Sequence, residues 1–358
     1  MIVTGFILGI VLGFIFQRGR FCVTGAFRDV WLSKSTRWLN AFLLAIAVQA
    51  VLVQFLTATG VINPSAPQLA IAAVAGGSFL FGIGIVLSGG CATGTYYRSG
   101  EGLIGSWIAL GLYAFSAAAM KYGVGANFTE TARNNTVDAT TIHETLGISA
   151  WVPVILFSGL VAYLLIRQSR RPHNPVAGLA PKKTGVAHVL FEKRWTPNAT
   201  AVLVGAIAAL AYPRSEATGR NAGLGITTPS ANVVQYLVTG QADLIDWGVA
   251  FVLGIIPGSY IAAKASGEFR LRAPDARTAV RSVFGGIIMG VGAALAGGCT
   301  IGNSLVQTAL FSWQGWIAFG FTFLGVGAAA HFFITNNSGT RTSSVPTAGV
   351  PRGLVQIK

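Results

Sequence analysis

The chain has 358 residues, of which 53% are hydrophobic and only 10% are charged, and its formal net charge is +14. A soluble domain carries roughly 25% charged residues, so this composition excludes an ordinary soluble protein and favours a membrane protein. The residue-by-residue alternation that a transmembrane β-barrel requires is not visible, which leaves a helical membrane protein.

Nine apolar segments follow one another along the chain, although several fall short of the about 20 residues that one transmembrane helix needs. We therefore predict an all-α polytopic membrane protein with about nine transmembrane helices. Only Met1 precedes the first segment, which we expect to be a retained span rather than a cleaved signal peptide. The segments cover residues 2–16, 38–60, 71–88, 103–120, 151–167, 199–212, 247–263, 282–296 and 315–334.

Basic residues are distributed unequally between the two sides of the membrane that these segments define. One side carries 21 of the 25 Lys and Arg residues, and the other carries the remaining 4. The positive-inside rule then places the N-terminus outside and the C-terminus in the cytoplasm. The charge of +14 is explained by this topology and by contact with anionic lipids, without nucleic-acid binding.

One cysteine motif occurs twice, 208 positions apart, in residues 82–94 and 290–302. Both copies fit G-x-G-x4-G-G-C-x-x-G without a gap, and they contain Cys91 and Cys299, two of the three cysteines. The copies end the third and the eighth predicted spans, which run in opposite directions. We therefore predict an inverted-topology internal repeat, with a pseudo-two-fold axis in the membrane plane.

The repeat divides the chain into two halves joined by the fifth span. The first half comprises residues 1–150, and residues 151–198 form a linker span and a basic cytoplasmic loop. The second half comprises residues 199–334, and residues 335–358 form a flexible cytoplasmic tail. In this alignment the third cysteine, Cys22, faces Ile226 of the second half.

The paired glycines before each cysteine predict breaks in the helices, because glycine lowers helix propensity. Non-helical backbone survives in a membrane only inside the protein or along a polar cavity. Short re-entrant half-helices are expected at residues 92–99 and 300–310, with N-termini that attract anions. With the nearby hydroxyl groups, these residues predict a site for an anion with a soft atom: Cys22, Cys91, Cys299, Gly89, Gly90, Gly297, Gly298, Thr24, Thr93 and Thr300.

Structural roles compete with this interpretation. Small residues let membrane helices approach closely, and a buried cysteine is often an inert apolar residue. Two copies of the motif at identical spacing favour a function over such packing. The three cysteines show no C-x-x-C pattern, which argues against a metal site, and no nucleotide-binding fingerprint appears. No cofactor is expected.

The two motifs, together with the stretch GRFCVTGAFRD at residues 19–29, resemble the YeeE/YedE family of bacterial inner-membrane sulfur-compound transporters. The resemblance runs to about residue 334 and implies an hourglass-shaped body of inverted halves. It also implies thiosulfate import along a path lined by Cys22, Cys91 and Cys299. A small cytosolic sulfur carrier of the TusA-like type (YeeD) is the implied partner.

Several alternatives remain open at this stage. Transfer along the cysteines could use S–H···S contacts or covalent persulfides, since thiolates also attack sulfur. The chain could instead be a membrane thiol redox or persulfide relay enzyme, a docking scaffold for a sulfur carrier, or a transporter of another sulfur or selenium anion. A transporter rather than an enzyme is the preferred interpretation.

Overall fold

The computed structural model describes residues 2–170, 184–193 and 195–335. Helices dominate these residues, and no β-strand occurs among them apart from three isolated bridges. Part of the predicted basic loop (171–183 and 194) and most of the predicted tail (336–358) lie outside the described residues.

Eight helical segments of the described chain are long and apolar enough to cross a membrane. Some of these segments consist of two successive helices, as in Ile2–Ser33. A ninth is obtained if the segment Gly185–Glu192 and α11, which meet at an angle of 87°, count as one span. The prediction of an all-α polytopic membrane protein is confirmed. The main helices are α1 (Ile2–Gly19), α2 (Val23–Ser33), α3 (Arg37–Ala58), α4 (Ile71–Leu87), α5 (Ala92–Gly100), α6 (Ile104–Tyr122), α7 (Ala126–Asn134), α8 (Ile142–Leu146), α9 (Trp151–Ser169), α11 (Pro197–Glu216), α12 (Thr227–Thr239), α13 (Trp247–Ala265), α14 (Ala276–Ala296) and α15 (Trp313–Ala330).

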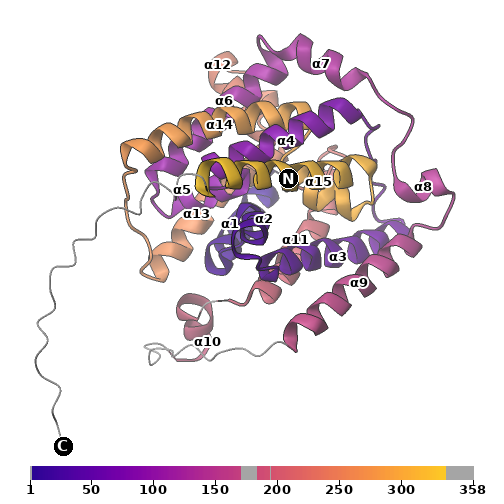
Figure 1. Cartoon of the computed structure of the whole chain (residues 1–358), viewed down its shortest axis with the longest axis horizontal. Helices are drawn as coiled ribbons and strands as arrows, with labels where there is room; N and C mark the ends of the chain where they lie inside the picture. Colours follow the sequence, from indigo (N-terminus) through magenta and orange to yellow (C-terminus); the bar gives the residue numbers. More distant parts are fainter. Residues whose placement is uncertain (1, 171–183, 194, 336–358) are drawn as a thin grey trace, which may run out of the picture.

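The packing pairs of these helices recur when the two halves are exchanged (Figure 1). Helix α1 packs on α13, and α11 packs on α3. Helix α4 packs on α15, and α14 packs on α6, while α4 and α14 pack on each other. This pattern is what a two-fold relation between the halves requires, although the boundaries of the halves remain a prediction.

The first two glycines of each cysteine motif are helix contacts. A Cβ at Gly82 would collide with the backbone of α15, and one at Gly290 would collide with the backbone of α6. In the same way Gly84 touches the backbone of α14, and Gly292 touches that of α4. Close backbone approach through small residues is typical of membrane helices. The G-x-G part of the motif is therefore explained by packing.

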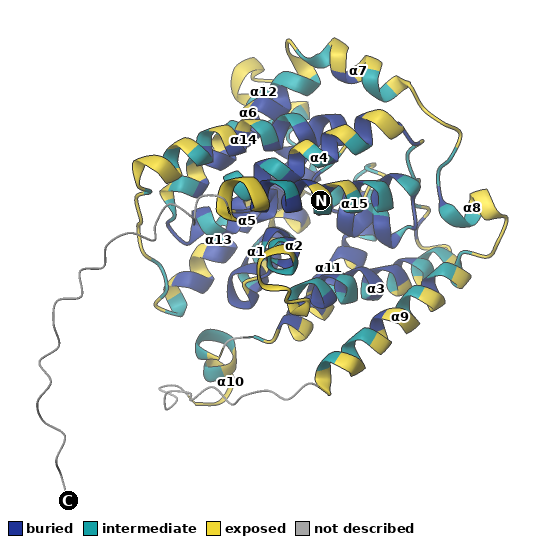
Figure 2. Cartoon of the chain, viewed as in Figure 1, coloured by how far each residue is buried: buried dark blue, intermediate teal, exposed yellow. Residues whose placement is uncertain are grey.

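Helix α9, the predicted linker span, lies at the edge of the molecule against α3 (Figure 1). Only Val154 and Val161 of this helix are buried, and large apolar side chains such as Leu156 are exposed (Figure 2). An apolar helix with so little protein contact is stable where lipid covers its outer face.

Candidate substrate path

Three short helices begin inside the protein, each directly after a break in the chain. Cys22 is the N-cap residue of α2, Cys91 that of α5 and Ile226 that of α12. The prediction that Ile226 corresponds to Cys22 thus agrees with their shared position at a helix start. A fourth helical segment follows Cys299 and begins with the π-helical turns Gly302–Gln307. Helix N-termini present unpaired N–H groups and attract negative charge.

The glycine pair before each motif cysteine makes the break. Gly89 has φ +72° and Gly297 has φ +75°, a left-handed conformation that favours glycine. The first break is held by Ser88, whose hydroxyl donates to the Gly90 carbonyl oxygen at 2.8 Å. The second is held by Asn303, whose Nδ2 donates to the Gly298 carbonyl oxygen at 3.2 Å.

Cys22 and Cys91 lie next to each other across the first half-helix. A methyl group on Gly94 would be 3.5 Å from the sulfur of Cys22 and 3.6 Å from that of Cys91, so both thiols face this glycine. The Gly94 amide also donates to the Cys91 sulfur at 3.4 Å. From the other half, Thr300 lies near Cys91, although its hydroxyl makes no hydrogen bond within the described chain. The two cysteine motifs therefore meet inside the molecule.

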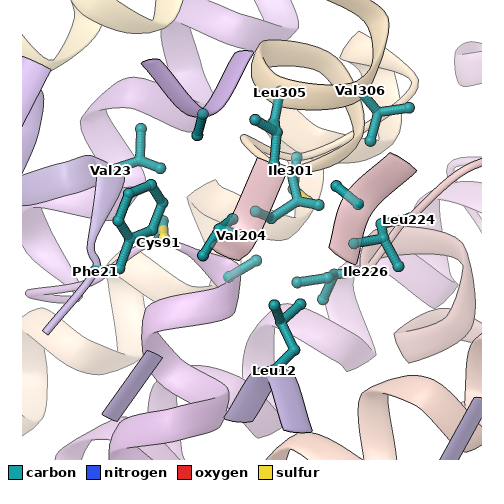
Figure 3. Close-up of a cluster of buried hydrophobic side chains, with 14 of the residues drawn as sticks. Leu12, Phe21, Val23, Cys91, Val204, Leu224, Ile226, Ile301, Leu305 and Val306 are labelled. Carbon is teal, nitrogen blue, oxygen red and sulfur yellow. The ribbon is translucent and has the colours of Figure 1, made fainter. Parts of the chain in front are cut away.

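The surroundings of these thiols are largely apolar (Figure 3). Figure 3 shows Phe21 and Val23 beside Cys91, with Ile226 and Ile301 on the other side of the same cluster. All three cysteines are free, with Cys91 and Cys299 buried and Cys22 half-buried. An apolar setting disfavours a charged sulfur, which suits a neutral thiol that donates S–H weakly.

The three predicted hydroxyl groups share an unusual property. Thr24, Thr93 and Thr300 are buried, and none of their side-chain oxygens has a hydrogen-bond partner within the described chain. A buried hydroxyl without a partner is costly, and such groups occur where they serve a function. Each stands within two residues of a cysteine, so these hydroxyls are available along the cysteine positions.

Cys299 lines a cavity of about 210 Å³. The cavity lies between its glycine pair, Gly297 and Gly298, and the first turn of α12. Two arginines, Arg133 and Arg220, also contribute to its wall. The cavity thus combines a thiol, a helix N-terminus and two guanidinium groups, which together favour an anion.

The cations of this cavity are only partly compensated by protein charges. Arg220 Nε lies 3.8 Å from an oxygen of Asp246, while its buried NH1 has no hydrogen-bond partner in the described chain. Desolvation lowers the pKa of both Arg133 and Arg220. Lys121 lies within electrostatic reach of both arginines and donates to the Thr228 hydroxyl at 2.5 Å. An anion in the cavity would relieve the mutual repulsion of these cations.

On the other side of the thiol pair, Arg20 is paired with carboxylates, whereas Arg98 bonds to uncharged groups. Arg98 donates to the Gly89 carbonyl oxygen and lies within electrostatic reach of Cys22 and Cys91. Two residues beyond Cys22 toward the N-terminus, Arg20 forms ion pairs with Glu101 and Glu268 at 3.3 and 2.9 Å. Burial raises the pKa of the Glu101 carboxyl, and the guanidinium groups of Arg20 and Arg98 offset part of this rise.

The structure brings the predicted cysteines, glycines and threonines into one central region, and their role as a binding site stays a prediction. The charged residues around them were not among the predicted site residues. Three of the four basic residues assigned to the outer side line or adjoin the cavity, namely Lys121, Arg133 and Arg220. The scarcity of basic residues on that side is the sequence feature that could have identified them. Among the described residues, no group of three or more His, Cys, Asp or Glu side chains could hold a metal ion.

Comparison with known proteins agrees with this architecture. Residues 18–328 match the family model described as "Sulphur transport". The chain is 50% identical to the thiosulfate transporter TsuA of Escherichia coli over 92% of its length and 94% of that protein. It is 32% identical to TsuA of Spirochaeta thermophila over 91% of its length and 97% of that protein.

A shorter similarity, 39% identity over 101 residues, relates the chain to the probable transporter YedE of Escherichia coli. Together with the multi-pass helical fold, these findings define a membrane transporter. The chain belongs to the sulphur transport family, which confirms the resemblance to YeeE/YedE proteins noted in its sequence.

Proposed function

We propose that this protein imports thiosulfate across the bacterial inner membrane. The single observation that carries the proposal is that the cavity at Cys299, from one half, lies beside the Cys91 and Cys22 thiols of the other half, with Thr300, which follows Cys299 in the chain, near Cys91. The names of the two TsuA relatives support thiosulfate as the substrate.

The chemistry of the path fits a dianion with one soft sulfur atom. Cations and the α12 N-terminus at the cavity attract the charge, and the oxygens of the anion can accept hydrogen bonds there. The terminal sulfur is poorly hydrated and can accept a weak S–H bond from a neutral thiol. Several weak sites in series permit conduction, since a single tight site would retain the ion.

The direction of transport follows from the proposed orientation. With the N-terminus outside and the C-terminus in the cytoplasm, the cavity at Cys299 opens outward and Cys22 lies nearer the cytoplasm. A TusA-like carrier protein on the cytoplasmic side would then receive the product. Basic residues close to that end of the path, Arg270 and Arg272, provide a surface for an acidic partner. Binding of such a carrier to proteoliposomes that contain the protein measures this part of the proposal.

Uptake of radiolabelled thiosulfate by proteoliposomes tests the path. We expect Cys91→Ala and Cys299→Ala to reduce uptake by at least about tenfold, because each removes one of the soft donors that share the ion. Cys→Ser variants keep a donor without the soft sulfur and should retain part of the activity. Val74→Ala is the matched control, since Val74 is fully buried in a separate small cluster. Normal uptake by folded Cys91→Ala and Cys299→Ala proteins would contradict the path.

A further inference from the structure

The short link between α1 and α2 places an exposed cation next to Cys22. Arg20 has φ +51°, a left-handed conformation that is strained for a residue other than glycine. Such a conformation persists only when surrounding contacts determine it. The side chain of Arg20 is 52% exposed, so its guanidinium group is accessible to a solute as well as to the protein.

Two carboxylates from different parts of the chain meet at this guanidinium group. Glu268 Oε2 lies 2.9 Å from Arg20 NH2 and also accepts a hydrogen bond from Gln17 Nε2 at 2.7 Å. Glu101 Oε1 lies 3.3 Å from Arg20 NH1. Arg18 adds a longer contact to Glu268, at 3.8 Å. Arg20 is therefore shared between two anionic partners that the protein itself supplies.

The backbone holds both carboxylates in place. Glu101 directly follows α5, the half-helix that Cys91 caps, and Glu268 lies just after α13. The segment after Glu268 runs beside the end of α5, where the Arg272 amide donates to the Gly102 carbonyl oxygen at 3.0 Å. The carboxylates are thus attached to the ends of α5, whose N-cap is Cys91, and α13, which packs on α1.

The two ends of the path differ in how their cations are compensated. At the Cys299 cavity, Asp246 is the sole carboxylate paired with Arg220 in the described chain, and Arg220 keeps one buried nitrogen unpartnered. At the Cys22 end, Arg20 has two carboxylate partners. The first arrangement favours capture of an anion, whereas the second leaves Arg20 little capacity to bind one.

We propose that Glu268, assisted by Glu101, is a release residue that occupies Arg20, so that an anion emerging past Cys22 is not retained there. This inference rests on the proposed transport of thiosulfate. A free arginine beside the exit would form charge-assisted hydrogen bonds with the dianion, which are among the stronger polar contacts. Conduction requires that the last site bind the ion weakly enough for the ion to leave. The carboxylates weaken it by competing for the same guanidinium group.

The test combines thiosulfate binding with thiosulfate uptake for one set of variants. Glu268→Gln removes the competing charge but keeps a side chain of the same size. We expect its Kd for thiosulfate to fall by about three- to fivefold, the factor that corresponds to one exposed ion pair. We also expect uptake by proteoliposomes to slow, because release becomes limiting. Isothermal titration of the purified protein gives the Kd, and radiolabelled thiosulfate gives the rate.

The double variant Arg20→Gln/Glu268→Gln should return the Kd toward the wild-type value, because the cation that retains the ion is gone. Asp29→Asn is the matched control, since it breaks the ion pair of similar exposure between Arg28 and Asp29, at 3.3 Å on α2. It should change neither quantity. If Glu268→Gln does not fold, Glu101→Gln provides the same comparison, with the same expected direction.

An unchanged Kd in Glu268→Gln, or a lowered Kd that persists in the double variant, would overturn the role of the carboxylates while wild-type uptake stands. Absence of thiosulfate uptake by the wild-type protein would instead overturn the proposed function itself. The two failures are therefore distinguishable in one experiment.

Discussion

Gly94 occupies the position between the two thiols at the centre of the molecule. An added methyl group would lie 3.5 Å from the Cys22 sulfur and 3.6 Å from the Cys91 sulfur. Both values are ordinary van der Waals distances, so the fold can accommodate alanine at this position. The methyl group would nevertheless fill the space that the two sulfurs share, which is where the proposed path requires the ion to pass.

We predict that Gly94→Ala folds normally but loses transport. Alanine within a helix is more stable than glycine by about 0.5–1 kcal/mol, so the melting temperature should not fall. Uptake should decrease by about tenfold, equivalent to about 1.4 kcal/mol. Thermal unfolding in detergent and proteoliposome uptake measure the two effects. Gly76→Ala in α4, where a methyl group meets nothing within 4 Å, is the control. Full uptake by Gly94→Ala would place the path elsewhere.

The repeated motif marks Cys91, Thr93, Cys299 and Thr300 in the sequence, and Cys22 and Thr24 lie outside it. The structure brings both groups into the central region, and their role as a site stays a prediction. The charges around them could not be predicted, since Arg98, Glu101 and Glu268 lie outside the two copies of the motif. Their proximity results from tertiary packing, which brings the ends of α1, α5 and α13 together. A sequence pattern predicts which face of a helix is buried, but it does not predict which other segment contacts the end of that helix.

At the scale of elements, α1 and α13 form a close contact through small residues. Gly5, Gly9 and Gly13 recur every four residues on α1, and an added Cβ at any of them would collide with the α13 backbone. On α13, a Cβ added at Gly254 or Gly258 would likewise collide with the α1 backbone. Since Cys22 follows α1 and Glu268 follows α13, this contact also fixes the spacing of the Cys22 end of the path.

We predict that Gly9→Ala destabilises the protein by about 1–3 kcal/mol, the usual cost of overpacking. The added methyl group would meet the Phe251 carbonyl oxygen of α13, so the two backbones must separate. The midpoint of thermal unfolding in detergent should fall accordingly. Gly159→Ala on the peripheral helix α9, with nothing within 4 Å of the new methyl group, should not lower it. Equal midpoints for the two variants would mean that α1 and α13 can separate enough for the methyl group without loss of stability.

The apolar spans could be predicted to within a few residues, as for the expected 38–60 and the observed α3, Arg37–Ala58. The short helices α2 and α12 were not predicted as separate elements, because their polar composition hides them among loops. The π-helical turns at Gly302–Gln307 have no sequence signal either, since the i→i+5 pattern depends on tertiary contacts.

At the scale of the whole molecule, the two ends of the proposed path are chemically different although the same motif occurs in both predicted halves. The Cys299 end carries Lys121, Arg133 and Arg220 with little compensation, whereas at the Cys22 end Arg20 is paired with two carboxylates. The repeated motif accounts for two of the cysteines and for the breaks that precede them. The charges to which we assign capture and release lie outside the motif, in loops and near helix ends.

The orientation of the molecule in the membrane decides which end captures the anion. The unequal distribution of Lys and Arg predicts that α7 and the cavity beside Arg133 face outward. We therefore expect alkaline phosphatase fused after Asn135, at the end of α7, to be active, since this enzyme folds only outside the cytoplasm. A fusion after Ser169, at the end of α9, should be inactive. A fluorescent protein fused at either point serves as the complementary control, because it fluoresces only when it folds in the cytoplasm. The opposite pattern of activity would place the Cys299 cavity in the cytoplasm, and the same path would then serve export.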